Sequence, residues 1–313
     1  MDNKMKENDL IKKLIAINEK AKKRGINITK EIFNLEKKID IAKSIRRYNR
    51  KKTKDAWDQV KLARKLERPK PQDFIDMLIK DRIEFHGDRY FKDDKTIYGG
   101  IGYFDDIPVT FIGTRKGKNL KENQLYNFGM PNPEGYRKSL RLVKQAEKFK
   151  RPVLFFIDTP GAYPGIASEE HGISEAIARN LFELSSIKTP MISIITGEGG
   201  SGGAIALSVA EKIIMMENSF LSVISPEGCA SILFKDPSKA PLAAKSLRLT
   251  ATELEKQNVI DDLIKETVAM HIDRKDGFIQ LKKSIRKNLK EIMSLNSDEL
   301  LKKRYEKYRR IGF

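Results

Sequence analysis

The segment Gly197–Gly203, GEGGSGG, concentrates residues whose spacing fits known chemistry. Gly197, Gly199 and Gly202 fit the pattern GxGxxG, in which glycines let the backbone approach the pyrophosphate of a dinucleotide. Glu217 follows at about the distance of the carboxylate that binds the ribose in such proteins. That pattern normally opens the first strand–helix unit of its domain, whereas a similar unit precedes it here. Dinucleotide binding is therefore one hypothesis for this segment.

The same letters also fit GxSxG, the turn that carries the serine nucleophile of many hydrolases. In that interpretation Ser201, between Gly199 and Gly203, attacks the substrate. The chain order of serine, acid and histidine in such enzymes leaves His271 as the base. His271 lies in the segment MHIDRKDG, which shows little sign of a catalytic loop. A hydrolase is the second hypothesis.

A third interpretation uses the backbone amides of the glycines and no side chain. Residues without a Cβ approach a ligand closely and adopt positive φ, so consecutive N–H groups at a helix start can point at one oxygen. A second turn of this kind, Thr159–Gly165 (TPGAYPG), follows the preceding strand. The two turns are predicted to converge on one site that stabilises an oxyanion. The alternative, in which the glycines only let a helix pack closely on the sheet, stays open.

Strand–turn–helix units must position these turns. The first two units are predicted from apolar runs, with strands at Pro152–Asp158 and Pro190–Thr196 and helices near Ile173–Ser185 and Gly203–Ala210. A third is predicted from Ile213–Met216, Phe220–Ser225 and a helix opened by Pro226. Near-continuous apolar strands that alternate with helices favour a mainly parallel α/β sheet covered on both faces.

The region before these units is predicted to contain a hairpin. β-Branched and aromatic residues indicate short strands at Thr96–Tyr103 and Pro108–Gly113 around a turn at Asp105–Asp106. A loop at Lys116–Pro133 and a helix at Glu134–Lys150 are expected to follow.

Basic helices flank this middle region. Apolar residues recur at helical spacing in Asn8–Lys23 and Thr29–Arg68, with a break at Arg24–Asn27, and again from Leu281 onward. Prolines near residue 70 mark a change of composition. We therefore predict a basic helical arm at residues 1–70, an α/β domain at 71–270 and C-terminal helices at 271–313.

The net charge of +18 lies entirely in the two flanks. Residues 1–70 hold 23 Lys and Arg against 10 Asp and Glu, and residues 271–313 hold 13 against 6. Residues 71–270 hold 25 against 27, so the middle is close to neutral. Secondary binding of nucleic acid by the flanks is a hypothesis, and a solvated face or an acidic subunit surface is the preferred interpretation.

Three features bear on location. Met1–Lys13 is densely charged and unlike a signal peptide, so we expect a cytoplasmic protein. Thr189–Ala210 has the length of a membrane span, but its five glycines and Glu198 argue against that role. The single cysteine, Cys229, allows no internal disulfide and no cysteine zinc site.

Seven segments together resemble one family. They are EFHGDRYFKDDKTIYGGIG (84–102), NFGMPNPEGYRKSLRL (127–142), FIDTPGAYPG (156–165), SEAIARNL (174–181), GEGGSGGA (197–204), SVISPEGCASIL (222–233) and KAPLAAKSL (239–247). Their order and sequence are similar to the carboxyltransferase alpha subunits of bacterial acetyl-CoA carboxylase, which belong to the crotonase-like superfamily. The resemblance covers roughly residues 70–265 and implies a crotonase-like spiral of strand–turn–helix units.

The resemblance also implies a reaction and its partners. The carboxyl group of carboxybiotin, held on a biotin carrier protein, passes to acetyl-CoA and gives malonyl-CoA. A zinc-ribbon beta subunit shares the active site in an alpha2–beta2 assembly, and a separate biotin carboxylase uses ATP. Neither covalent biotin nor a metal is expected on this chain.

Site residues follow from the same resemblance. The amides of Gly202, Gly203, Gly161 and Ala162 are expected to hold the ureido oxygen of biotin as it becomes negative. Substrate contacts are expected from further residues in the loops, namely Arg115, Lys116, Lys118, Tyr163 and Ser201. For the three cations, CoA phosphates or the partner subunit are the proposed ligands, and a solvated loop is the alternative interpretation.

Overall fold

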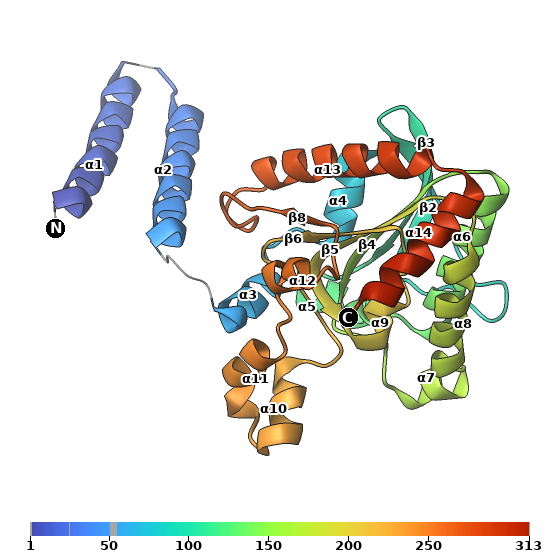
Figure 1. The fold of residues 1–313 in the computed structure, drawn as a ribbon. Helices are drawn as coiled ribbons and strands as arrows, with labels where there is room; N and C mark the ends of the chain where they lie inside the picture. The colour runs from blue at the N-terminus through green and yellow to red at the C-terminus, as the bar shows by residue number, and fades with distance from the viewer. Residues whose placement is uncertain (1, 25, 51–54, 313) are drawn as a thin grey trace. The chain divides into compact units, whose positions relative to one another are not determined.

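The computed structural model describes residues 2–24, 26–50 and 55–312. Contacts within the chain divide it into two compact units, Met1–Thr53 and Lys54–Phe313. This division falls before the boundary near residue 70 that charge and composition predict. The relative placement of the two parts in Figure 1 is not determined, so each is described by itself.

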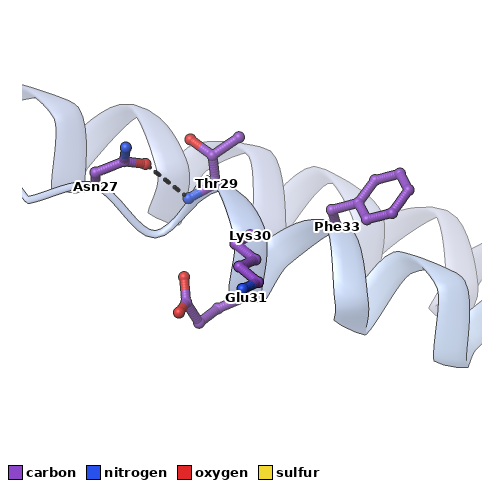
Figure 2. Close-up of a pocket in the computed structure, with 5 residues that line it drawn as sticks. All are labelled: Asn27, Thr29, Lys30, Glu31 and Phe33. Carbon is purple, nitrogen blue, oxygen red and sulfur yellow. Dashed lines mark hydrogen bonds between the residues drawn. The ribbon is translucent and has the colours of Figure 1, made fainter.

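The N-terminal unit is a pair of helices, α1 (Asp2–Lys23) and α2 (Thr29–Arg50). The predicted break between them is confirmed, and the side chain of Asn27 accepts a hydrogen bond from the Thr29 amide at 3.2 Å. An open pocket beside this break is lined by Asn27, Thr29, Lys30, Glu31 and Phe33 (Figure 2). The pocket belongs to this unit, whereas both glycine turns belong to the other.

The prediction of one helix over Thr29–Arg68 was wrong. Helix α2 ends at Arg50, and a separate helix, α3 (Ala56–Ala63), begins after Asp55. The Asp55 carboxylate caps α3 by accepting a hydrogen bond from the Asp58 amide at 2.6 Å, which favours a new helix start there. Residues 51–54 of the predicted helix lie outside the described residues.

Within residues 55–312, eight strands form one sheet in the order β1-β2-β3-β4-β5-β6-β8, with β7 paired to β5. Strands β1 to β3 are antiparallel, and the pairs from β3 to β8 are parallel. The strands are β1 (Ile79–Glu84), β2 (Ile97–Phe104), β3 (Ile107–Thr114), β4 (Val153–Thr159), β5 (Met191–Gly200), β6 (Lys212–Met216), β7 (Phe220–Ser222) and β8 (Asp262–Ile264). The predicted hairpin and the mainly parallel sheet are confirmed.

Helices cover both faces of the sheet, as predicted (Figure 1). Strand β4 shows why, since its side chains alternate between two apolar clusters. Phe155 packs with residues of α6 (Pro133–Lys148) and α8 (Ile173–Ser186), whereas Phe156 packs with residues of α4 (Pro71–Leu78) and α13 (Lys275–Met293). Both phenylalanines are fully buried.

Shorter helices connect these layers. They are α5 (Leu120–Leu125) and the 3₁₀ turn η1 (Asn127–Gly129), both inside the predicted loop, then α7 (Ile166–Glu170), α9 (Ser201–Ile205), α10 (Pro226–Phe234), η2 (Pro237–Lys239), α11 (Ala240–Ser246) and α12 (Ala251–Lys256). The helix predicted at Pro226 is confirmed. Across the described residues, no helix combines the length and apolar character that a membrane crossing needs.

The predicted C-terminal helices are confirmed as α13 and α14 (Ser297–Arg310). Arg304 on α14 is buried and pairs with Glu211. Its guanidinium also donates to the carbonyl oxygens of Leu184 and Ile187, at 2.7 and 2.8 Å. The last helix thus supplies donors to the unpaired carbonyls at the end of α8.

Candidate active site

The glycine-rich segment is mostly strand. The prediction of a turn over Gly197–Gly203 was wrong for its first half, because β5 continues to Gly200 and is buried at every position. This extension pairs with β7, from Glu198 opposite Phe220 to Gly200 opposite Ser222. A partner strand distant in sequence therefore holds the glycines extended. The predicted helix at Gly203–Ala210 is also corrected, since α9 begins at Ser201 and ends at Ile205.

The two glycine turns meet at the carboxyl ends of β4 and β5. A Cβ added to Gly203 would lie 2.4 Å from the Ala162 nitrogen and 2.5 Å from the Gly161 carbonyl carbon. A Cβ on Gly200 would lie 2.0 Å from the Pro160 oxygen. Contacts this close leave no room for a side chain, so glycine at both positions allows one backbone to pack against the other.

The amides at this junction differ in availability. Ser201, Gly202 and Gly203 are the first three residues of α9, so their N–H groups have no acceptor within the helix. Gly202 and Ala162 are half-buried, which leaves them accessible from solvent. The Gly161 amide instead donates to the Thr159 hydroxyl at 3.1 Å. The amides of Ala162 and Gly202 are thus partly accessible and that of Gly203 is buried, while Gly161, with φ of +150°, shapes the turn.

Two tyrosines line the junction. Tyr136 from α6 is fully buried, and its hydroxyl lies 2.8 Å from where a Cβ on Gly203 would be. That hydroxyl has no hydrogen-bond partner among the described residues, and burial raises the pKa of Tyr136, so the phenol stays neutral. Tyr163 is half-buried, its amide donates to the Pro131 oxygen at 3.0 Å, and its ring lies over Gly165.

The three cations predicted to contact substrate have different surroundings. Lys116 is directed inward, with Nζ 3.0 Å from Asp158 Oδ1 and 3.3 Å from Glu198 Oε2. Burial opposes its charge, but the two carboxylates outweigh it and raise the pKa of Lys116. Arg115 pairs with Glu84 at 3.0 Å, and Lys118 is half-exposed beside Asp73. Of the three, Lys118 is the most accessible to a ligand.

A family model described as acetyl co-enzyme A carboxylase carboxyltransferase-like matches residues 1–312. The chain belongs to this family. It is 48% identical to an acetyl-coenzyme A carboxylase carboxyl transferase subunit alpha of Listeria monocytogenes, over 97% of this chain and 95% of that protein. The subunit of the same name from Alkaliphilus oremlandii is 50% identical, over 96% and 94%.

Solved structures confirm the expected crotonase-like fold of this family member. A transcarboxylase 12S with methylmalonyl-coenzyme A and methylmalonic acid bound superposes with a TM-score of 0.59 and 16% identity, over 76% of this chain and 44% of that one. A Pseudomonas malonate decarboxylase hetero-tetramer in complex with coenzyme A gives 0.56 and 16%, over 68% and 85%. At such identity the likeness shows the fold alone.

Several residues that surround the glycine junction were not predicted from the sequence. Arg64 contacts Glu198 at 2.7 Å, and Arg68 donates to the Thr196 oxygen at 3.1 Å. Both lie in the region predicted to be a solvated basic arm. Charge and composition alone do not show which cations of this region have partners. Among the described residues, no cluster of His, Cys, Asp and Glu could hold a metal ion.

His271, the base that the hydrolase hypothesis requires, lies beside cations. Its Nε2 is 3.2 Å from Lys65 Nζ, and burial together with Lys65 and Arg68 lowers its pKa to about 4. The ring is therefore neutral near pH 7 in the folded chain.

We expect the stability to fall as the pH drops from 6.5 toward 4, because the unfolded chain then binds a proton that the folded chain does not. Urea unfolding at pH 7 and pH 5 measures this loss. His271→Asn cannot be protonated and should lose less stability over the same interval. An identical pH dependence in wild type and variant would contradict the assignment.

Proposed function

We propose that this chain is the carboxyltransferase alpha subunit of a cytoplasmic acetyl-CoA carboxylase. It transfers the carboxyl group from carboxybiotin, held on a biotin carrier protein, to acetyl-CoA, and the malonyl-CoA formed commits carbon to fatty-acid synthesis. The observation that carries the proposal is the convergence of the β4 and β5 glycine turns, in a chain 48% identical to a subunit of that name. Converging backbone donors suit a reaction in which negative charge develops on one oxygen.

The proposed role of the junction is to bind the ureido oxygen of biotin. The donors at this junction would be backbone amides at the start of α9, which suit an oxygen atom that gains negative charge. When bound, carboxybiotin would supply the carboxyl group and, once decarboxylated, the base that takes the proton from acetyl-CoA. The amides of Ala162, Gly202 and Gly203 stabilise the negative oxygen, and removing one such donor typically costs about 10²- to 10³-fold in rate.

The proposal includes partners. A zinc-ribbon beta subunit completes the active site, binds acetyl-CoA and stabilises its enolate, in an alpha2–beta2 assembly. A separate biotin carboxylase loads the carrier with ATP. The chain is therefore expected to be inactive without the beta subunit.

The test is reconstitution with a beta subunit from a close relative. Mixed subunits should decarboxylate malonyl-CoA in the presence of free biotin, and each subunit alone should not. The control is an alpha subunit of a relative assayed with the same beta subunit. Inactivity of this chain beside an active control would refute the proposal.

A Ser201→Ala variant in the same assay distinguishes the proposed function from the hydrolase hypothesis, in which Ser201 is the nucleophile. This residue is exposed and has φ of +51°, a left-handed conformation that alanine and serine adopt at similar cost. Ser201→Ala should keep activity within about tenfold, because it removes at most one contact between the hydroxyl and the substrate, whereas loss of a nucleophile costs about 10⁶-fold. Steady-state rates of both proteins decide between the two.

A further inference from the structure

Strands β4 and β5 lose their regular pairing just before the two glycine turns. The register is continuous from Val153 opposite Met191 to Ile157 opposite Ile195. The next pair is Thr159 opposite Gly199, so β5 contains extra residues between the two pairs. This bulge, which covers Thr196–Glu198, sets where the end of β5 lies relative to the end of β4.

The side chain of Asp158 occupies the bulge. Its Oδ1 accepts a hydrogen bond from the Glu198 amide at 3.0 Å, which replaces a bond of the interrupted ladder. A Cβ on Gly197 would lie 2.6 Å from the Asp158 carboxyl carbon, so glycine is required for this contact. Asp158 is 1% exposed, and its own amide donates to the Thr114 hydroxyl at 2.9 Å.

Cations fix this carboxylate and the bulge around it. Lys116 Nζ bridges Asp158 Oδ1 and Glu198 Oε2, and Arg64 contacts the other oxygen of Glu198 at 2.7 Å. Arg68 donates to the Thr196 oxygen at 3.1 Å. Burial alone would raise the pKa of Asp158, but Lys116 and Lys70 outweigh it and lower the value, so the pair is ionised near neutral pH.

We propose that Asp158 and Lys116 are positioning residues for carboxyl transfer. By fixing the bulge, they hold the backbone of Gly200–Gly203 against Gly161–Ala162 and so aim the amides at one oxygen. This inference rests on the proposed function and assigns Lys116 a role different from substrate binding. A displacement of about 1 Å in such a site can cost about 10²-fold in rate.

The experiment uses the reconstituted alpha–beta complex, with kcat and KM measured for malonyl-CoA and for biotin. Asp158→Ala and Lys116→Met should each lower kcat by about 10²-fold, with KM changed by less than about threefold. Asp158→Asn keeps the acceptor for the Glu198 amide and the shape of the side chain, so it should retain more kcat than Asp158→Ala. Should the alanine variant not fold, the asparagine and methionine variants carry the test.

Asp105→Asn is the matched control for Asp158→Asn. It also replaces an ion-paired aspartate by asparagine, but Asp105 pairs with Lys282 and Arg286 and lies away from the bulge. Its kcat should equal that of wild type. A raised KM with unchanged kcat in Lys116→Met would overturn the inference in favour of substrate binding. A lower unfolding temperature with unchanged kcat would overturn it in favour of a purely structural role. An inactive wild-type complex would instead reject the proposed function itself.

Discussion

Gly203→Ala is expected to abolish carboxyl transfer, with a loss of at least about 10²-fold. The added methyl would lie 2.4 Å from the Ala162 nitrogen and 2.5 Å from the Gly161 carbon, both backbone atoms that no rotamer change can move away. The turns must therefore separate, and the amides of Ala162 and Gly203 no longer point at one oxygen. The measurement is biotin-dependent decarboxylation of malonyl-CoA by the complex with the beta subunit.

Gly202→Ala is the matched control for this prediction. It makes the same change one residue earlier in α9, where the new methyl would come no closer than 3.7 Å to the Ile177 side chain. The amide of residue 202 is retained, so most activity should remain. Circular dichroism and thermal unfolding of both variants check that the fold persists. Equal activity of the two variants would contradict the steric argument.

Arg68→Met is expected to destabilise the chain by about 3–5 kcal/mol. Arg68 and Glu266 both have 0% side-chain exposure, and two nitrogens of Arg68 contact two oxygens of Glu266 at 2.6 and 3.0 Å. The variant would leave the Glu266 carboxylate buried without its cation. The free energy of unfolding in urea at pH 7 measures the loss. Arg310→Met, at an exposed pair with Glu306, is the control and should cost less than about 1 kcal/mol.

The pH dependence of the Arg68 variant gives a second readout. Burial alone would raise the pKa of Glu266, but Arg68 outweighs it and holds that pKa below its usual 4.5. The ion pair therefore contributes its full stability above pH 4.5, the usual pKa of a glutamate. This contribution is lost as the pH falls through the lower pKa that Glu266 has in the folded chain. The difference between wild type and Arg68→Met should shrink in acid, since protonation of Glu266 relieves the variant. A difference independent of pH would contradict the ion-pair explanation.

The sequence predicts the strand–turn–helix units because their strands are local apolar runs. It fails at Gly197–Gly200, where glycine has no intrinsic preference for a strand and the pairing with β7 imposes one. It fails again at Lys116 and Arg68, because each of these cations is held by a carboxylate that is distant in the sequence. The sequence alone therefore locates the strands that lead into the turns. It does not show the ion pairs and hydrogen bonds that fix the turns, because these join residues distant in the sequence.

The buried guanidinium of Arg304 has a consequence for synthesis of the chain. It donates to carbonyls of Leu184 and Ile187, residues translated long before it. Until the final helix leaves the ribosome, that end of α8 and the carboxylate of Glu211 lack their cation. The domain is therefore expected to reach its native state only once α14 has left the ribosome, and nascent chains halted before Arg304 should stay sensitive to protease.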